Sequence, residues 1–247
     1  MTDLSNKVVV IMGASSGIGA ATARRLAKDG AKLVITARRL DRLNEIASEF
    51  PDGQVIPVKA DVTNFKEVQS AVQTAVDQFG RIDVLYNNAG IMPLSPLSEG
   101  HRDEWQNMLN INIMGPLNGI AATLPIMKKQ GQGHIITTDS VAGHVVAPGM
   151  AVYSGSKYAT RIIMDGLRME EAQNHIKTTI ITPPGSTQSE LTSHISDPET
   201  RKQNTDYWST VDGLTADQIA QAVEFAIANK DNMSVSEMIV RPTLQSM

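Results

Sequence analysis

Short apolar runs alternate with longer amphipathic stretches along most of the chain. The apolar runs are rich in Val and Ile and lack polar alternation, which is typical of strands buried on both faces of a sheet. We expect strands at residues 7–12, 32–37, 54–60, 82–86, 133–139, 177–182 and 235–241. The stretches between them repeat apolar residues with helical spacing. We expect helices at residues 20–29, 41–50, 64–79, 101–130, 153–175 and 215–229.

The order of these elements predicts the fold class. Four strand-then-helix units follow one another, which predicts parallel strands joined by right-handed crossovers. We therefore expect an α/β fold with a doubly wound sheet of about seven parallel strands in a three-layer α-β-α arrangement. Neither a linker nor a repeat divides the chain, so we expect residues 1–247 to form a single domain.

Two segments depart from the regular pattern. The stretch 101–130 is long for one helix, and Pro125 is expected to kink it. Within it, the polar Asn112 stands among apolar neighbours, and a buried amide needs partners, so it either caps a local helix break or holds a water molecule. Residues 186–213 are polar without a clear period, and we expect them to form a functional lid over a substrate.

Composition and charge narrow the function classes. Hydrophobic residues make up 41% of the 247 residues and aromatic residues only 4%, so the core must be aliphatic. The net charge of −4 argues against a nucleic-acid-binding surface. Cysteine is absent, which excludes disulfides, thiolate metal sites and cysteine nucleophiles, and the scattered histidines give no metal-ligand spacing. No apolar run reaches membrane-spanning length, and no signal peptide is recognisable, so we expect a cytoplasmic protein without a membrane partner.

A glycine-rich loop connects the first strand to the first helix. The spacing is Gly13-x-x-x-Gly17-x-Gly19. Glycines let the backbone turn tightly and approach a pyrophosphate, while the helix N-terminus offers free N–H groups and a positive dipole end. The alternative is a purely structural glycine turn. We expect this loop to bind a dinucleotide cofactor through Gly13, Ser15, Ser16, Gly17, Ile18 and Gly19.

Basic residues follow the second strand. In dinucleotide-binding folds a carboxylate near this point accepts hydrogen bonds from a ribose 2′-hydroxyl, whereas a basic residue suits a 2′-phosphate. Here Arg38 and Arg39 come first, and no carboxylate appears before Asp41. Guanidinium groups match phosphate oxygens and stay charged. The pattern predicts NADP(H) rather than NAD(H), with Arg38 the stronger candidate; alternatively, both arginines are solvated residues at the start of the next helix.

Polar and small residues also follow the third and fourth strands. Asp61, at a strand's carboxyl end, is placed to accept a hydrogen bond from an adenine amino group. The run Asn87-Asn-Ala-Gly90 allows a ligand ribose to approach closely. The same residues are expected to tie neighbouring loops together.

Tyr153 and Lys157 stand four residues apart in an expected helix. This spacing places a phenol and an ammonium on one helix face. A nearby cation favours phenolate and lowers the pKa of the tyrosine, so that it can exchange a proton near neutral pH. Taken alone, such a pair is more often a contact on the helix surface. The glycine loop, the arginines after the second strand and the positions of Ser140 and Asn112 favour a catalytic role instead.

Taken together, these motifs resemble the short-chain dehydrogenase/reductase family over almost the whole chain. The matching residues occur in the family's order: Gly13-x-x-x-Gly17-x-Gly19, Asp61-Val62, Asn87-Asn88-Ala89-Gly90, Asn112, Ser140, Tyr153-x-x-x-Lys157 and Pro184-Gly185. The segment 236–242 also resembles the end of a subgroup of broad-specificity NADP-dependent alcohol dehydrogenases. The resemblance implies a Rossmann-type fold, a homotetramer or homodimer, and a small-molecule carbonyl or alcohol substrate.

The resemblance also implies roles for individual residues. Ser140 would orient the substrate oxygen, and Tyr153 would protonate it or deprotonate an alcohol. Lys157 would lower the tyrosine pKa and bind the nicotinamide ribose. Asn112 would hold a water molecule that links Lys157 to solvent, and Thr187 would meet the nicotinamide carboxamide. The remaining cofactor contacts implied are Asp61, Val62, Asn88, Ala89, Gly90, Pro184 and Gly185.

Two residues near Ser140 are open to more than one interpretation. Asp139 stands where many family members have Ser. Neighbouring strand residues point to opposite faces, so we expect Asp139 to face away from Ser140. If it faces the pocket instead, it opposes anionic substrates and raises the pKa of the base. His144 follows in the next loop, where a solvated side chain is the expectation and a substrate contact the alternative.

Three functions compete. The favoured function is an NADP-dependent carbonyl reductase or alcohol dehydrogenase, because all the catalytic positions of the family are present. A reductase of carrier-bound 3-oxoacyl chains would need a basic docking surface, and residues 186–213 hold only Arg201 and Lys202. A non-catalytic NADP-binding redox sensor is the third possibility, but such proteins typically lose the Tyr or the Lys.

Overall fold

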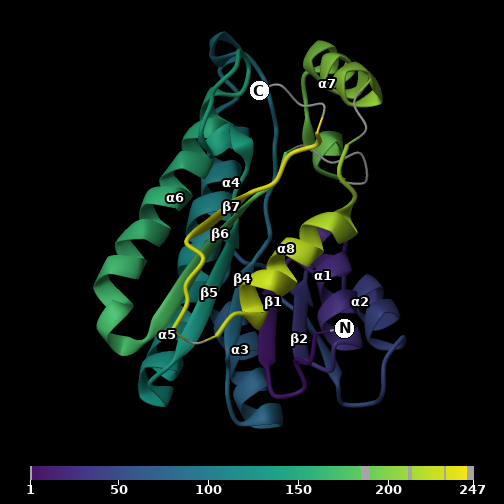
Figure 1. Ribbon diagram of the computed structural model, residues 1–247. Coiled ribbons are helices and arrows are strands. Elements are labelled where there is room, and N and C mark those ends of the chain that lie inside the picture. The colour runs from purple at the N-terminus through teal and green to yellow at the C-terminus, as the bar shows by residue number, and fades with distance from the viewer. Residues whose placement is uncertain (1, 185–189, 211–212, 231, 244–247) are drawn as a thin grey trace.

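A seven-stranded parallel sheet forms the centre of the protein, in the order β3-β2-β1-β4-β5-β6-β7 (Figure 1). The structure is a computed structural model, and it describes residues 2–184, 190–210, 213–230 and 232–243, with the side chains of residues 207–210 left out. The strands are β1 (Val8–Met12), β2 (Lys32–Ala37), β3 (Val55–Lys59), β4 (Val84–Asn87), β5 (Gly133–Thr138), β6 (Ile176–Thr182) and β7 (Glu237–Ile239). The expected doubly wound α/β fold is therefore confirmed.

The strand order reverses beside β1. Met12 at its end pairs with Thr36 of β2 on one side and with Asn87 of β4 on the other. The chain therefore winds outward in both directions from β1, and the loops at the carboxyl ends of β1 and β4 diverge. In sheets of this kind, ligands bind in the crevice that forms at this switch point.

Helices cover both faces of the sheet. They are α1 (Gly17–Lys28), α2 (Leu40–Ala47), α3 (Phe65–Phe79), α4 (Arg102–Leu109), α5 (Gly115–Gln130), α6 (Ala151–Glu171), α7 (Pro198–Thr210) and α8 (Ala216–Ala228). Helices α1, α2 and α8 lie over one face, and α3, α5 and α6 over the other (Figure 1).

The alternation of side chains along β1 separates two hydrophobic cores. Val8, Val10 and Met12 belong to the core beneath α3, α5 and α6. Val9 and Ile11 belong to the core beneath α1 and α8. All five side chains are at most 3% exposed. Because both faces of the strand are buried, its sequence is a continuous apolar run. It lacks the polar alternation of a strand with one face exposed to solvent.

The expected helix at 101–130 is interrupted. It divides into α4, a π-helical turn at Asn110–Met114 and α5. The break contains Asn112, and the capping role expected as one alternative for its side chain stays a prediction. Pro125 lies inside α5; the kink expected there stays a prediction. A single π turn inserted between α-helices commonly accompanies a functional site.

The polar segment 186–213 contains more regular structure than its sequence indicates. Its described residues form the 3-10 turn η5 (Glu190–His194) and α7. Ile195, between them, is fully buried, whereas most of the described side chains of α7 are exposed. A helix with so little buried surface needs no apolar period, which is why the pattern did not predict it.

Among the described helices, none is both long and apolar enough to cross a membrane.

Candidate functional site

A cavity of about 560 Å³ opens at the carboxyl ends of the strands. It runs from the glycine loop and the end of β2, past the ends of β4 and β5, to α6 and η5. Most of the residues predicted to bind cofactor or act in catalysis line it: Gly13, Ser15, Ser16, Gly17, Ile18, Arg38, Arg39, Asp61, Val62, Asn88, Ala89, Gly90, Ser140, Tyr153, Lys157 and Pro184. The fold thus brings together residues from the whole length of the chain.

Four predicted residues are not in this lining. Gly19 and Asn112 lie behind it, and Gly185 and Thr187 fall outside the described residues.

Two glycines of the loop, Gly13 and Gly19, pack too closely against their neighbours to accept a side chain, whereas Gly17 has open space around it and φ +52°. Gly13 has φ +88°, and a Cβ there would lie 2.7 Å from the backbone of Ala89. A Cβ on Gly19 would overlap the carbonyl oxygen of Gly13 and lie 2.6 Å from Nδ2 of Asn88. Asn88 Nδ2 donates a hydrogen bond to Gly13 O at 2.9 Å. The lack of a side chain at Gly19 therefore allows the loop to pack closely against Asn88. The loop backbone remains accessible to a phosphate group.

A chain of hydrogen bonds joins this loop to the helix that carries Lys157. The Lys157 ammonium donates to the backbone oxygen of Thr138 at 2.8 Å. The Thr138 hydroxyl donates to Oδ1 of Asn88 at 3.0 Å and lies 2.7 Å from the hydroxyl of Tyr86. Asn88 in turn holds Gly13. Asn88 and Thr138 thereby fix the position of the ammonium relative to the glycine loop.

Tyr153, Lys157 and Ser140 meet at the inner end of the cavity. Tyr153 and Lys157 are 3% and 6% exposed, and the Lys157 ammonium lies 5.9 Å from the centre of the Tyr153 ring. Burial raises the pKa of Tyr153 well above its usual value; a hydrogen bond with Ser140 opposes the rise and the charge of Asp139 adds to it. Burial also lowers the pKa of Lys157.

The pKa of Tyr153 therefore moves in the direction opposite to the one expected from the neighbouring Lys157. The ammonium turns toward Thr138, and the desolvation of the phenol outweighs the interactions that favour the phenolate. The group that favours the phenolate is Ser140.

Asn112 supports the site from behind. Its Oδ1 accepts the N–H of Ile91 at 2.9 Å, and its Nδ2 donates to Ile91 O at 3.0 Å and to Ser156 Oγ at 3.1 Å. Its backbone oxygen accepts the Thr160 hydroxyl at 3.1 Å, a bond the π turn makes available. The amide thus ties the loop after β4 to α6. The water molecule expected on this residue stays a prediction.

The basic residues after β2 behave differently from one another. Arg38 is exposed at the cavity mouth. Arg39 folds back onto the glycine loop, where it donates to Ser15 Oγ at 3.0 Å and to Ser16 Oγ at 3.1 Å. Arg39 also pairs with Glu190 at 2.8 Å, and Glu190 takes Arg42 at 2.6 Å. Hydrogen bonds from Arg39 and Arg42 lower the pKa of Glu190 to about 2.

Asp61 lines the cavity, but one carboxylate oxygen is already used. Oδ1 accepts the N–H of Thr63 at 2.9 Å and its hydroxyl at 2.8 Å. This arrangement orients the carboxylate at the end of β3, in agreement with the expected position.

Asp139 fits neither expected orientation fully. It is 2% exposed, and Arg161 Nε lies 3.8 Å from Oδ2. A Cβ on Gly143 would lie 2.5 Å from Oδ2, so the carboxylate packs beneath the loop after Ser140. It is closed off from solvent, yet its charge acts on Tyr153 and Lys157. Burial raises the pKa of Asp139 to about 6.

The expectation of a solvated His144 is wrong. Its Nε2 lies 2.6 Å from Oε1 of Glu237 in β7, and the side chain is only 21% exposed. Glu237 is far away in the sequence, so no local pattern could have identified the pair.

Much of the remaining cavity lining is apolar. Met92 and Met150 line it, together with Val145, Ala147 and Leu191. Asn204 of α7 also reaches the lining, and its Oδ1 is buried with no partner in the described part of the chain. Leu191 and Asn204 come from the segment 186–213. The sequence did not identify them, because the polar segment has no apolar period to show which of its side chains face the cavity.

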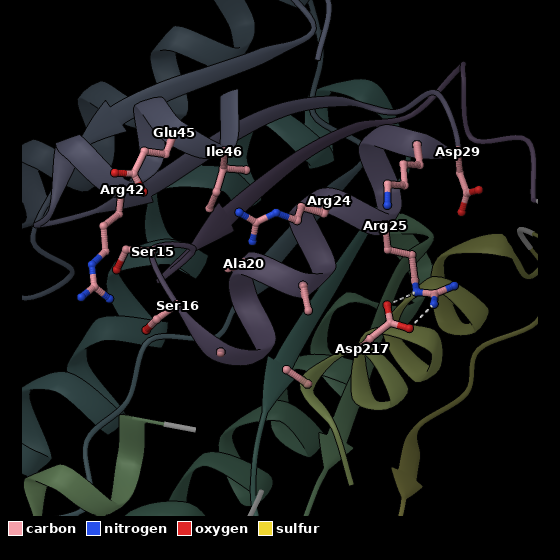
Figure 2. Close-up of a pocket in the computed structure, with 14 residues that line it drawn as sticks. Ser15, Ser16, Ala20, Arg24, Arg25, Asp29, Arg42, Glu45, Ile46 and Asp217 are labelled. Atoms are coloured by element: carbon pink, nitrogen blue, oxygen red, sulfur yellow. Dashed lines mark hydrogen bonds and ion pairs between the residues drawn. The ribbon is translucent and has the colours of Figure 1, made fainter. Parts of the chain in front are cut away.

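A second hollow, of about 910 Å³, lies outside the glycine loop between α1, α2 and α8 (Figure 2). Arg24 and Arg25 project toward it. Each is neutralised: Arg24 pairs with Glu49 at 2.7 Å, and Arg25 with Asp217 at 2.6 Å. Because carboxylates already occupy these guanidinium groups, the hollow offers an anion much less than the arginine count implies.

Comparisons with known proteins agree with this geometry. Residues 7–200 match the family model described as short chain dehydrogenase. An uncharacterised oxidoreductase of Staphylococcus saprophyticus is 49% identical over 249 residues, which cover 100% of both chains.

Solved structures also resemble the whole fold. A serine dehydrogenase in its closed form with NADP+ has a TM-score of 0.90 at 27% identity, covering 97% of this chain and 96% of that one. An alcohol dehydrogenase of the archaeon Thermococcus sibiricus, complexed with 5-hydroxy-NADP, has a TM-score of 0.84 at 28% identity, covering 98% of both. A dehydrogenase/reductase of Burkholderia phymatum in complex with NAD has a TM-score of 0.86 at 27% identity, covering 97% and 90%. The glycine loop, the Tyr153–Lys157 pair and these matches agree, and the chain belongs to the short-chain dehydrogenase family of oxidoreductases.

Proposed function

We propose that the protein is an NADP(H)-dependent oxidoreductase that moves a hydride reversibly between the coenzyme and a small ketone, aldehyde or secondary alcohol. One observation carries the proposal. Tyr153, Lys157 and Ser140 meet at one end of a cavity whose other end is lined by a glycine loop and by Arg38 and Arg39. A proton donor thereby faces a site shaped for a dinucleotide.

The residues fit such a cofactor physically. The glycine loop lines the cavity and leads directly into α1, so its backbone N–H groups and the start of α1 are accessible to a pyrophosphate. The Ser15 and Ser16 hydroxyls and the Arg38 guanidinium would hold an additional phosphate. When bound, the nicotinamide supplies the hydride or accepts it.

Each catalytic side chain then has a separate task. The Ser140 hydroxyl donates a hydrogen bond to the carbonyl oxygen of the substrate and orients it. The Tyr153 hydroxyl gives its proton to that oxygen during reduction, and the phenolate takes the proton back from an alcohol during oxidation. The Lys157 ammonium, which donates one hydrogen bond to Thr138, offers its other N–H groups to a ribose. Asn112 keeps the loop after β4 in register with α6.

The preference for NADP(H) is the finer part of the proposal. Its support is the pair Arg38 and Arg39 at the end of β2, because no carboxylate occurs between that strand and Asp41. Arg38 is exposed at the cavity mouth, and Arg39 already bridges the hydroxyls of Ser15 and Ser16. A 2′-phosphate would add two negative charges among these groups.

A carrier-bound acyl substrate receives no support. The basic residues available for docking in the segment 186–213 are used locally: Arg201 donates to the backbone oxygen of Ile195, and Lys202 pairs with Asp206 at 2.8 Å. The apolar lining of Met92, Met150 and Leu191 suits a small, uncharged substrate instead.

We extend the proposal to the surroundings of the site. The segment 186–213 would act as a substrate lid, since Leu191 and Asn204 line the cavity. A homotetramer or homodimer would cover the apolar side chains that α6 exposes, Tyr158, Ile162 and Met169, at 55%, 55% and 72% exposure. The cytoplasmic location expected from the sequence stays a prediction.

A coenzyme-oxidation screen tests the proposal. NADPH and NADH would each be supplied with ketones, diketones, aldehydes and β-keto esters. NADPH labelled with deuterium at the reactive position of the nicotinamide should yield an alcohol with one deuterium on its carbinol carbon. Oxidation of NADPH with at least one carbonyl class is expected. Failure of every class with both coenzymes, or a product without deuterium, contradicts the proposal.

A further inference from the structure

A buried charge cluster lies directly beneath the catalytic loop. Its centre is Asp139, the residue before Ser140, whose two carboxylate oxygens have no hydrogen-bond partner within the described residues. Arg161 Nε, at 3.8 Å from Oδ2, is also buried without a hydrogen bond. The two groups attract each other without making the short contact of an ordinary ion pair. This leaves the Asp139 charge available to act on its other neighbours.

Arg161 connects the cluster to three separate elements. It stands one turn after Lys157 on α6, so Tyr153, Lys157 and Arg161 share one face of the helix. Its Nη1 donates to Gly143 O at 3.1 Å, which holds the loop after Ser140. Its Nη2 lies 3.5 Å from Glu237 of β7.

Glu237 closes the cluster on the far side. Its Oε1 accepts the Thr182 hydroxyl at 2.8 Å and lies 2.6 Å from His144 Nε2. The groups around Asp139 therefore come from α6, from the loop after β5 and from β7. They are Tyr153, Lys157, Arg161, His144 and Glu237.

A metal ion is a poor occupant for this cluster. Ligand atoms of Asp139, His144 and Glu237 lie within 4.8 Å of one another, as a metal site would need. However, the Arg161 guanidinium already stands beside both carboxylates, and the Lys157 charge acts on Asp139. A divalent cation would meet these two positive charges. The chain's own cations already stand where a metal ion would bind, so the proton is the cation that this cluster can exchange.

We propose that Asp139 is a positioning residue of the proposed reductase site: through its negative charge it sets the pH range in which Tyr153 exchanges its proton, and Arg161 holds that charge beneath the Ser140 loop. The proposal rests on the proposed function, because it assigns Tyr153 the proton transfer. It goes beyond the proposed function by giving a task to Asp139, which lines the cavity beside Ser140. Gly143 is needed for this arrangement, because any side chain there would collide with the Asp139 carboxylate.

The direction of the effect follows from the charges. An ionised Asp139 disfavours phenolate at Tyr153 and favours the ammonium at Lys157. Ionised Asp139 thus keeps the proton on Tyr153. The neutral phenol is the form of Tyr153 that can protonate a carbonyl. A neutral side chain at position 139 should make phenolate form at lower pH. The ionised carboxylate also costs stability, because its desolvation outweighs the neighbouring groups that favour its charge.

The first test is the pH profile of alcohol oxidation with NADP+, in Asp139→Asn and in the matched control Asp165→Asn. Asp165 also lies on α6, but its side chain is 59% exposed and pairs only with Arg168. In Asp139→Asn we expect the rising limb of the plot of kcat/KM against pH to move to lower pH by about 0.5 pH unit or more. In the control the limb should not move. An unshifted limb, or equal shifts in both variants, overturns the proposal.

The second test needs no substrate. A purely structural Asp139 would make Asp139→Asn less stable at every pH. The proposed role predicts a higher thermal midpoint than the parent at pH 7.5 and a much smaller difference at pH 4. Asp139→Ser, a smaller uncharged variant, should show the same sign. A lower midpoint for both variants at pH 7.5 contradicts the proposal.

The two tests separate this inference from the function on which it rests. If NADPH is oxidised with a carbonyl and Asp139→Asn leaves the pH limb unmoved, the positioning role fails alone. If no carbonyl is reduced but the midpoint rises as expected, the burial argument holds and the proposed function fails.

Discussion

Asn112 gives the sharpest stability prediction, because its amide makes three hydrogen bonds inside the protein. The partners are the N–H and the C=O of Ile91 and the hydroxyl of Ser156, at 2.9, 3.0 and 3.1 Å. Asn112 is 2% exposed and Ile91 is 9% exposed. Asn112→Ala therefore removes the partners of buried groups that water reaches poorly.

The size of the loss follows from these contacts. Each bond contributes roughly 1 kcal/mol net, and a buried group left without a partner costs about 1–3 kcal/mol more. With both backbone groups of Ile91 affected, we expect Asn112→Ala to lower the free energy of unfolding by about 3–5 kcal/mol. That is a large part of the 5–15 kcal/mol typical of a whole domain.

The control lies two residues earlier in the same π turn. The Asn110 side chain accepts one hydrogen bond, from Gln106 at 3.0 Å on the surface. Asn110→Ala should cost less than about 0.5 kcal/mol, as surface substitutions usually do. Urea denaturation followed by circular dichroism and by fluorescence would compare the two variants. Equal stabilities for Asn112→Ala and Asn110→Ala would refute the reasoning.

Three further predictions follow from the site. Arg38→Ala should weaken NADPH binding at least about tenfold while changing NADH binding little; equal losses in a fluorescence titration would remove the support for NADP(H). Gly19→Ala should lower the free energy of unfolding by about 2 kcal/mol or more, because its Cβ would lie 2.6 Å from Asn88 Nδ2. The control Gly166→Ala, with open space around its Cβ, should be neutral or stabilising. Equal denaturation midpoints for the two variants would contradict this prediction. The pKa of Asp139 rises from 3.8 to about 6 on folding, so its contribution to stability is present below pH 4 and is lost as the pH rises through 6. The advantage of Asp139→Asn in unfolding free energy should therefore grow by about 2–3 kcal/mol between pH 4 and pH 7, and a difference that stays constant with pH would contradict this.

The sequence predicts the parts of this site that depend on local spacing. The strands are identifiable because both faces are buried, and the glycine loop because only glycine permits its close packing against Ala89. The Tyr153–Lys157 spacing predicts that both residues share a helix face, and the structure places both in the cavity lining.

The remaining features depend on contacts between distant segments. The phenol pKa could not be predicted from the neighbouring lysine, because burial by the surrounding fold decides its direction. The contact of His144 with Glu237 requires β7 to add to the sheet beside β6. Glu190, which holds Arg39, lies in a segment whose exposed helix leaves no apolar period to read. The resemblance to the family could not help here, because none of these residues belongs to the shared motifs.

The catalytic role of Tyr153 can be tested by comparing coenzyme binding with turnover in Tyr153→Phe. The variant removes one hydroxyl from a buried ring and leaves the glycine loop, Lys157 and the arginines in place. Tyr158→Phe, which changes an exposed tyrosine on the same helix, is the control. We predict that Tyr153→Phe binds NADPH within about threefold of the parent while turnover with the best carbonyl falls by about 100- to 10,000-fold, and that the control matches the parent in both. Turnover in Tyr153→Phe within a few fold of the parent would contradict the account.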